Sequence, residues 1–244
     1  MKNIAIIPAR YDSTRFHGKV LAEDTGKYLV QHTYERVLEA GRVSDVYIAT
    51  DSEKVLDACE RFGAKCIMTG DYHKSGTDRI AEAAAKIDAD IIINVQADEP
   101  EINPCDIDEL ALKLEQNTGA VMATMVTTIS DDNWLSNPNI VKAVLDCNQR
   151  AIYFSRSAIP YNRDSGCPDK TLAYRHLGIY AYRRDFLLKI TKLPQTPLEK
   201  CESLEQLRVI ENGYQIIAVK STSNHEGIDT QEQYEAFVAR MLNK

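Results

Sequence analysis

The stretch that decides the fold is IAIIPARYDSTRFHGK, residues 4–19. Residues 4–7 are apolar and largely β-branched, which predicts a buried strand. The residues after them have no apolar periodicity and contain three cations, Arg10, Arg15 and Lys19. In open α/β sheets, the loops that follow the strands bind ligands. Because arginine and lysine side chains bind phosphate oxygens, this loop predicts a polyphosphate site. The alternative is a solvated basic loop on an acidic protein.

The composition limits the class of protein. The chain has 244 residues, enough for one large α/β domain or two small ones. Its net charge of −7 argues against general binding to nucleic acids or membrane surfaces. The six cysteines form no Cys-x-x-Cys pair, so we expect reduced thiols in a cytoplasmic protein, with no zinc site or disulfide framework. We also expect no signal peptide and no membrane insertion, since no apolar run approaches the length of a membrane span.

Strand-like and helix-like segments alternate through the first half of the chain. Residues 29–40 have apolar side chains at helical spacing and end at Gly41, a suitable C-cap. Residues 90–95, DIIINV, form the strongest buried strand. The other expected elements are strands at 46–49 and 65–68, a helix that Asp51 or Ser52 caps and that runs to Phe62, and a helix that Thr77 or Asp78 caps and that runs to Ile87. This alternation predicts an α/β fold with a mostly parallel, doubly wound sheet.

The second half of the chain is less regular. We expect strands at 121–127, 140–145, 151–154, 177–182 and 216–219, helices at 106–115 and 231–243, and one or two helices at 198–211. Residues 160–171 are polar and contain Gly166 and Pro168, which favours a mobile loop. No linker, repeat or low-complexity tract divides the chain. We therefore expect one domain over residues 1–244, with a smaller inserted β-rich subregion at about 150–200 that covers the substrate.

Two carboxylates are candidate metal ligands. QADEP, residues 96–100, follows the strongest strand, and in a parallel sheet it lies at the same edge as the first loop. Mg²⁺ takes one or two carboxylates together with substrate phosphates, so Asp98 is a natural ligand for it. The alternative is that Asp98 or Glu99 caps the turn before Pro100. Asp229 either caps the last helix or is a second metal ligand.

Other motifs suggest contacts to a ligand. In SGTDR, residues 75–79, Gly76 allows a ligand to approach the backbone and the following helix presents free N–H groups. The alternative there is an ordinary helix N-cap. Cations and tyrosines flank residues 160–171, where they would suit a sugar acid or pair with surplus acidic residues: Arg156, Arg163, Arg175, His176, Tyr161, Tyr174, Tyr180 and Tyr182. Glu205 and Gln206 face away from the apolar side of their helix, toward solvent or a ligand.

Three other classes of site find no support. Ser155, Ser157 and His176 could suggest a hydrolase, but the chain has no Gly-x-Ser-x-Gly elbow. The dinucleotide-binding Gly-x-Gly-x-x-Gly pattern and the Walker A lysine pattern are also absent.

Taken together, the motifs resemble the 3-deoxy-manno-octulosonate cytidylyltransferases, or CMP-Kdo synthetases, over nearly the whole chain. The motifs that carry the resemblance are IPARY (7–11), STR (13–15), GK (18–19), QH (31–32), ATD (49–51), SGTDR (75–79), NVQ (94–96), DEP (98–100), YFSR (153–156), IPY (159–161), RHLGIY (175–180), ESLEQLR (202–208) and DT (229–230). Each motif is short, but their order over one chain of this length is specific. The resemblance implies a nucleotide-diphospho-sugar transferase fold, usually a homodimer, to which residues at about 150–200 contribute.

The resemblance also implies a reaction and a set of functional residues. The reaction is the activation of the sugar acid Kdo by CTP, with Mg²⁺, to give CMP-Kdo and pyrophosphate for lipopolysaccharide assembly in the cytoplasm. Arg10, Arg15 and Lys19 would hold the CTP phosphates and, with Asp98, form the catalytic set. The other implied contacts are Ala9, Arg10, Ser75, Arg79 and Gln96 to the nucleotide, Asp98 and Asp229 to Mg²⁺, and Arg156, His176, Tyr180, Glu205 and Gln206 to the sugar acid.

Three positions depart from the family pattern. His17 and Tyr28 stand where the family usually has proline, and Ala97 stands where it usually has glycine. Losing proline loosens a loop, and a methyl group at position 97 narrows the approach to the nucleotide.

Two other functions stay open: a cytidylyltransferase for a related acid, such as an 8-amino analogue of Kdo or a sialic-type acid, and a non-catalytic nucleotide-binding protein.

Overall fold

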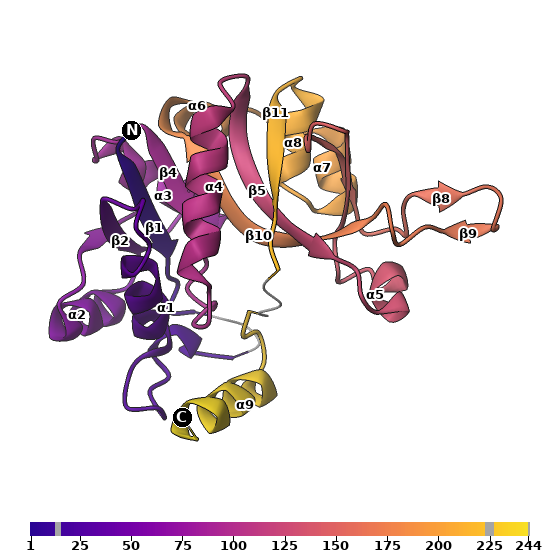
Figure 1. The fold of residues 1–244 in the computed structure, drawn as a ribbon. Helices are drawn as coiled ribbons and strands as arrows, with labels where there is room; N and C mark the ends of the chain where they lie inside the picture. The colour runs from indigo at the N-terminus through magenta and orange to yellow at the C-terminus, as the bar shows by residue number, and fades with distance from the viewer. Residues whose placement is uncertain (13–15, 223–226, 244) are drawn as a thin grey trace. The chain divides into compact units, whose positions relative to one another are not determined.

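The structure is a computed structural model that describes residues 1–12, 16–222 and 227–243 (Figure 1). The chain separates into two compact units. The first comprises Met1–Asp108 and His225–Lys244, and the second comprises Glu109–Asn224. Both units contain helices and strands, which confirms the predicted α/β class. The second unit includes all of the β-rich subregion expected at about 150–200.

The first unit is built on a parallel sheet with the strand order β4-β1-β2-β3. Its strands are β1 (Asn3–Pro8), β2 (Asp45–Thr50), β3 (Cys66–Met68) and β4 (Ile91–Asn94). β1 lies between two other strands and all six of its residues are buried, as its apolar run predicts. Since β1 and β4 run parallel, the loops that follow them begin at the same edge of the sheet.

Cap residues explain where several helices of the first unit begin or end. They are α1 (Leu29–Leu38), α2 (Glu53–Phe62), α3 (Gly76–Ala85) and α9 (Gln231–Leu242), with a 3-10 turn η1 at Lys19–Leu21. α2 ends at Gly63, whose φ of 75° suits glycine. The cap predicted for α3, Thr77 or Asp78, is wrong by two or three residues, because Ser75 caps the helix by accepting the Asp78 N–H.

The second unit is built on a mixed sheet. β5 (Ala120–Thr128) pairs in parallel with β11 (Gln215–Lys220) and antiparallel with β10 (Tyr174–Arg183). β6 (Lys142–Leu145) pairs antiparallel with β10 and with β7 (Ala151–Ser155), which confirms the predicted strand pair. The helices are α5 (Asp132–Ser136), α6 (Arg184–Ile190), α7 (Pro197–Glu202) and α8 (Gln206–Glu211), and α4 (Pro104–Gln116) runs across the boundary in sequence between the units. No helix in the described part of the chain is long and apolar enough to cross a membrane.

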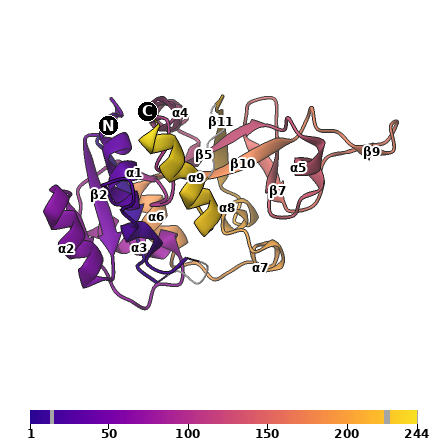
Figure 2. The same cartoon turned by 90° about the horizontal axis from the view of Figure 1, so that it is seen from below.

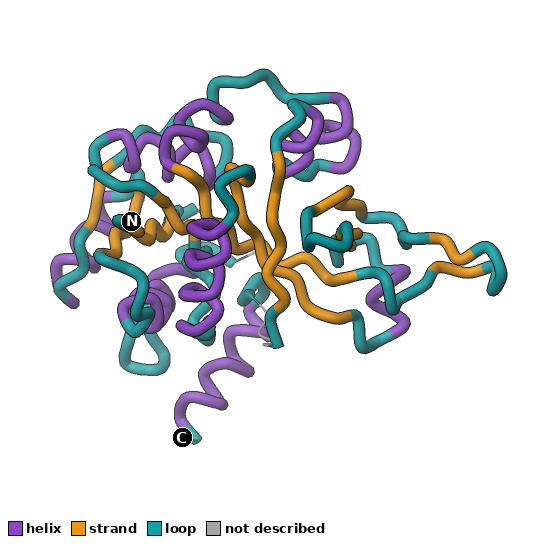
Figure 3. The backbone as a smooth tube through the Cα atoms, turned by 45° about the horizontal axis from the view of Figure 1, so that its top comes forward, coloured by secondary structure: helices purple, strands orange, loops and turns teal. Residues whose placement is uncertain are grey.

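The structure adds detail to two segments of the second unit. The predicted loop at 160–171 contains a short hairpin of β8 (Tyr161–Asn162) and β9 (Cys167–Pro168), which projects from the rest of its unit (Figures 1 and 3). Gly166, at a φ of 69°, closes its turn by donating its N–H to the Asn162 carbonyl oxygen. The helical stretch at 198–211 is two helices, because Ser203 between them has a left-handed φ of 53°.

Candidate active site

A buried lysine, Lys19, marks the candidate active site. It is 8% exposed, and its Nζ donates to Asp98 Oδ2 and to the Ile228 carbonyl oxygen, each at 2.6 Å. The same ammonium lies 3.6 Å from Asp229 Oδ1. Removing an ammonium from water costs several kcal/mol unless opposite charges pair with it, which these two carboxylates do. The structure therefore brings three of the predicted residues together, whereas Arg15 lies outside the described residues.

Backbone contacts from separate segments hold this centre in place. Gly18 has a left-handed φ of 67° and donates its N–H to the Tyr11 carbonyl oxygen, which turns the chain just before Lys19. In the turn that follows β4, the Thr33 hydroxyl donates to the Ala97 carbonyl oxygen at 3.1 Å. The backbone next to Asp98 is thus held from α1, and the Ala97 side chain at this position is buried.

The two carboxylates fit a divalent cation. Asp98 and Asp229 already hold one positive charge in common, the Lys19 ammonium. Carboxylate oxygens are hard ligands of the kind that Mg²⁺ prefers. Among the described residues, no group of three or more His, Cys, Asp or Glu side chains is arranged to hold a metal ion. Mg²⁺ at this pair would complete its coordination with water or substrate phosphate oxygens, which is the usual arrangement for this ion.

Arg10 is exposed and is held by the loop that precedes α3. Its Nη2 donates to the His73 carbonyl oxygen at 2.5 Å. Glu82 of α3 organises that loop, because its carboxylate accepts the Gly70 N–H at 2.9 Å and lies 2.6 Å from His73 Nε2. The hydrogen bond from Gly70, with those from Lys86 and His73, lowers the pKa of Glu82 to about 2. Arg10 therefore has a defined place after β1, from which a phosphate contact is possible.

Three predicted nucleotide contacts lie around the loops of the first unit. Ala9 follows β1 directly, is fully buried and donates its N–H to the Ala49 carbonyl oxygen at 2.8 Å. The Ser75 hydroxyl caps α3 through the Asp78 N–H, so the ordinary N-cap interpretation of this motif is correct for the structure. Gln96 is half-buried in the turn after β4. Contact between these residues and a nucleotide stays a prediction.

The fourth predicted nucleotide contact, Arg79, is engaged within the first unit. It is fully buried, and its two terminal nitrogens donate to Thr69 Oγ1 at 2.7 Å and to Asp51 Oδ2 at 2.5 Å. The guanidinium thereby braces the loop before α3 against the residue that follows β2. The geometry gives Arg79 a supporting role in the site, and its direct contact with a nucleotide stays a prediction.

Replacing Arg79 by lysine is expected to destabilise the protein by about 1–3 kcal/mol. A single ammonium does not reproduce the guanidinium fork, so Thr69 or Asp51 loses its buried donor. Equilibrium urea unfolding of the two proteins measures the difference. The matched control is Arg61→Lys, since the hydrogen bond from Arg61 to the Tyr28 hydroxyl, at 3.4 Å, is exposed to solvent. Equal unfolding free energies for the Arg79 variant and the wild type would contradict the bracing role.

The predicted contacts to the sugar acid all belong to the second unit. Arg156 follows β7, and its guanidinium donates to the carbonyl oxygens of Glu202 at 2.7 Å and Pro138 at 3.0 Å. The Glu202 carboxylate accepts the Ser155 hydroxyl at 2.6 Å and the Arg156 N–H at 2.9 Å. Arg156 and Glu202 therefore tie the end of β7 to the end of α7, directly before the break at Ser203.

Glu205 and Gln206 lie at the start of α8, just after that break. Glu205 is the N-cap residue and is half-buried. Gln206 is 5% exposed, and its Nε2 has no hydrogen-bond partner among the described residues. A buried donor left unsatisfied costs about 1–3 kcal/mol, which a ligand oxygen would recover. This orphaned amide supports the prediction that Gln206 contacts a ligand.

His176 and Tyr180 are neighbours on β10. Their ring centroids are 5.5 Å apart, and the Phe154 ring packs edge-on against His176 at 4.8 Å. His176 Nε2 lies 2.9 Å from the Thr124 hydroxyl. Burial lowers the pKa of His176 to about 3. The ring is therefore neutral near pH 7 and offers hydrogen bonding rather than positive charge to a sugar acid.

The burial of His176 makes stability depend on pH. Its pKa is about 3 in the folded protein against an ordinary 6.5, so the unfolded chain binds more protons between those values. Stability should therefore fall as the pH drops from about 6.5 toward 3. His176→Phe removes this contribution, so the loss of Tm between pH 7 and pH 5 should be smaller in the variant. Burial also lowers the pKa of His32, but that residue is present in both proteins. An identical pH dependence in the two proteins would contradict the assignment.

Lys142 in β6 is a buried positioning residue that no sequence motif singled out. Its Nζ donates to the carbonyl oxygens of Asn137 at 2.9 Å, Ile140 at 2.7 Å and Arg156 at 2.5 Å. Burial lowers the pKa of Lys142. The backbone of Arg156 is therefore held by a fully buried ammonium. The available signal was a single lysine within the otherwise apolar stretch IVKAVL, residues 140–145.

Comparison with known proteins agrees with this fold. A family model described as cytidylyltransferase matches residues 4–220, so by class the chain is a cytidylyltransferase. The 3-deoxy-manno-octulosonate cytidylyltransferases of Geobacter metallireducens and Geotalea uraniireducens are each 47% identical to it, over 99% of this chain and 98% and 99% of theirs. A solved CMP:2-keto-3-deoxy-manno-octonic acid synthetase complexed with CTP is 41% identical, with a TM-score of 0.94 over 100% of this chain and 99% of its own. The chain belongs to the 3-deoxy-manno-octulosonate cytidylyltransferase family.

Proposed function

We propose that this chain transfers the cytidylyl group of CTP to 3-deoxy-manno-octulosonate (Kdo), giving CMP-Kdo and pyrophosphate. The observation that carries the proposal is the buried Lys19 ammonium between the carboxylates of Asp98 and Asp229. In this arrangement the ammonium would bind phosphate oxygens of CTP, and the two carboxylates would bind a divalent ion. The names of the relatives and the CTP in the solved neighbour support the choice of substrates.

The proposed reaction is an in-line displacement at phosphorus. The anomeric hydroxyl of Kdo loses its proton to solvent and attacks the α-phosphorus of CTP, a new P–O bond forms, and the bond to the departing pyrophosphate breaks. The Lys19 ammonium stabilises the negative charge that grows on the phosphoryl oxygens. Arg10 and Arg15 bind the phosphates of the leaving group. No side chain needs to form a covalent intermediate.

In this proposal Asp98 and Asp229 hold Mg²⁺. When bound, Mg²⁺ supplies a Lewis acid that offsets phosphate charge and lowers the pKa of the attacking hydroxyl. The cytidine lies near four residues of the first unit: Ala9, Ser75, Arg79 and Gln96. Kdo is held by five residues of the second unit: Arg156, His176, Tyr180, Glu205 and Gln206. Among these, the Gln206 Nε2 donates to an oxygen of the sugar acid.

We also propose a homodimer that supplies CMP-Kdo to lipopolysaccharide assembly in the cytoplasm. Residues at about 150–200 contribute to the dimer. Tyr161 in the projecting hairpin and Leu172 just after it support this, because they are 67% and 60% exposed and large apolar side chains are common at interfaces. Light scattering of the purified chain tests the stoichiometry, and a monomer at micromolar concentration would contradict it.

A pyrophosphate-release assay tests the proposed reaction. The purified chain is incubated with Mg²⁺, each of four nucleoside triphosphates, and a panel of Kdo, its 8-amino analogue and a sialic-type acid. Release that needs both CTP and Kdo supports the proposal. Faster turnover of another acid would move the substrate to that acid, and CTP binding without release under any condition would favour a non-catalytic nucleotide-binding protein.

A further inference from the structure

The residue before Asp229 bridges two parts of the catalytic centre through its backbone. The Ile228 N–H donates to the Asp98 carbonyl oxygen at 2.8 Å, and the Ile228 carbonyl oxygen accepts from Lys19 Nζ at 2.6 Å. Ile228 is 3% exposed, so water competes little for either bond. The spacing between Lys19 and Asp98 therefore depends on where the chain leading into α9 lies.

The start of α9 also fixes the backbone of Asp229. The N–H groups of Asp229 and Thr230 both donate to Gln233 Oε1, at 2.7 and 3.0 Å. In return, the Gln233 N–H donates to the Thr230 hydroxyl at 3.3 Å, which completes a capping box. Any displacement of the first turn of α9 would therefore displace the Asp229 carboxylate with it.

Tyr234 fastens α9 to the segment that carries Lys19. It is 2% exposed, its ring centroid lies 5.4 Å from that of Phe16, and its hydroxyl accepts the Asp24 N–H at 2.9 Å. Phe16 and Asp24 lie on either side of Lys19 in the sequence. One side chain of α9 therefore holds both ends of the segment 16–24.

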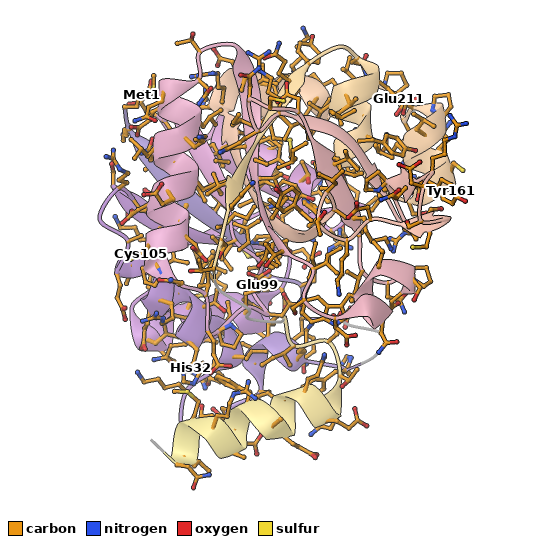
Figure 4. The ribbon with its side chains drawn as sticks, turned by 45° about the vertical axis from the view of Figure 1, so that its right-hand side comes forward. Met1, His32, Glu99, Cys105, Tyr161 and Glu211 are labelled. Carbon is orange, nitrogen blue, oxygen red and sulfur yellow. The ribbon has the colours of Figure 1, made fainter. Side chains whose placement is uncertain are left out.

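The next turn of α9 anchors the helix on α1. Phe237 is fully buried, and its ring packs edge-on against His32 of α1 at a centroid distance of 5.2 Å. Leu29, Ile228, Tyr234 and Phe237 form one buried apolar cluster. Figure 2 shows α9 alongside α1, and Figure 4 shows labelled His32 near the same helix. The helix is thus packed on the scaffold of the first unit and presents its first turn to the catalytic centre.

We propose that residues 227–242 form a C-terminal clasp that assembles the catalytic centre, with Tyr234 as its positioning residue. Tyr234 holds the segment 16–24 against α9. The Ile228 backbone can then hydrogen-bond to both Lys19 and Asp98, and the Asp229 carboxylate lies near the Lys19 ammonium. The inference rests on the proposed function and adds to it a residue that touches neither substrate. Positioning of this kind matters because a displacement of about 1 Å at a reacting centre costs about 10²-fold in rate.

The test compares Tyr234→Ala and Tyr234→Phe with the wild type and with Glu235→Ala, an exposed neighbour on the same helix. The readouts are kcat, the KM values for CTP and Kdo, and amide hydrogen exchange of the peptide that contains Ile228. We expect Tyr234→Ala to lower kcat by about 10²-fold. Tyr234→Phe keeps the ring and loses one hydrogen bond, so we expect a loss of about 2- to 10-fold. Both changes should affect kcat more than KM and speed exchange at Ile228, whereas Glu235→Ala should behave as the wild type.

The hydrogen-exchange measurement tests the clasp independently of the proposed reaction. If the wild type releases no pyrophosphate, the proposed function fails, and protection of the Ile228 amide that depends on Tyr234 still supports the clasp. Equal acceleration of exchange in β5 and β10 would mean general unfolding and would overturn the positioning role. Unchanged kcat and unchanged Ile228 protection in Tyr234→Phe would also overturn it. That variant keeps the buried ring, so it decides the matter if Tyr234→Ala does not fold.

Discussion

Replacing Lys19 by methionine is expected to lower kcat by about 10²–10³-fold at saturating CTP, Kdo and Mg²⁺. Removing one charged group that stabilises a transition state typically costs that much. The side chain keeps most of its length, so the effect reports the missing charge. The remaining carboxylates keep contact with water, since the side chains of Asp98 and Asp229 are 27% and 50% exposed. The variant should therefore fold, and far-ultraviolet circular dichroism with a thermal melt checks that it does.

Lys27→Met is the matched control for this prediction. Lys27 belongs to the same stretch of chain, but its Nζ pairs at 2.6 Å with Glu35 at the surface. Surface pairs of this kind contribute about 0–1 kcal/mol to stability, and this one lies outside the catalytic set. Turnover of the control should stay close to that of the wild type. A Lys19 variant that turns over as fast as the Lys27 variant would remove Lys19 from the catalytic residues.

The parallel sheet of the first unit could be predicted because its signals are local and consistent. The apolar run in β1 predicts a strand buried on both faces, and all six residues of that strand are buried. Gly63 marks the end of α2 by its left-handed φ. The C-cap expected at Gly41 is wrong, because α1 ends at Leu38 with Glu39 as its C-cap. The cap of α3 was assigned to the wrong residue because Ser75, Thr77 and Asp78 are all good capping residues. Only the geometry shows which hydroxyl reaches the free N–H.

The details of the second unit were harder to predict because they depend on tertiary contacts. The break between α7 and α8 requires a left-handed Ser203, and serine has no intrinsic preference for that conformation. Arg156 and Glu202 favour the break by tying β7 to the end of α7. Neither contact is encoded in a periodic pattern. The hairpin at 161–168 likewise has only two residues in each strand, too few to show alternation.

In the candidate site, too, some residues could be predicted from the sequence and others could not. The sequence predicted that the loops carrying Lys19 and Asp98 lie at one edge of the sheet, because those loops follow parallel strands. It also offered Asp229 as a second metal ligand. It gave no sign of the Ile228 carbonyl oxygen, since any residue supplies a carbonyl group. It also gave no sign of Tyr234, because an aromatic residue on the apolar face of a helix predicts only packing.

Replacing Asp98 by asparagine is expected to lower kcat by about 10²–10³-fold and to raise the Mg²⁺ concentration that gives half-maximal rate. Asparagine has nearly the same shape, so the hydrogen bond from the Ile228 N–H to the carbonyl oxygen of residue 98 should persist. What changes is the charge: the ammonium of Lys19 loses one of its two carboxylates, and the proposed Mg²⁺ ion loses an anionic ligand. Pyrophosphate release measured over a series of Mg²⁺ concentrations separates weaker ion binding from slower turnover.

Asp88→Asn provides the control, because the Asp88 side chain is 96% exposed and pairs with Lys2 at 3.3 Å. It makes the same change in net charge without touching the catalytic centre, so its rate and Mg²⁺ dependence should match the wild type. Turnover of Asp98→Asn within tenfold of the wild type at saturating Mg²⁺ would show that Asp98 is not a metal ligand. A loss in kcat with an unchanged Mg²⁺ requirement would mean that Asp98 positions the Lys19 ammonium and does not bind Mg²⁺.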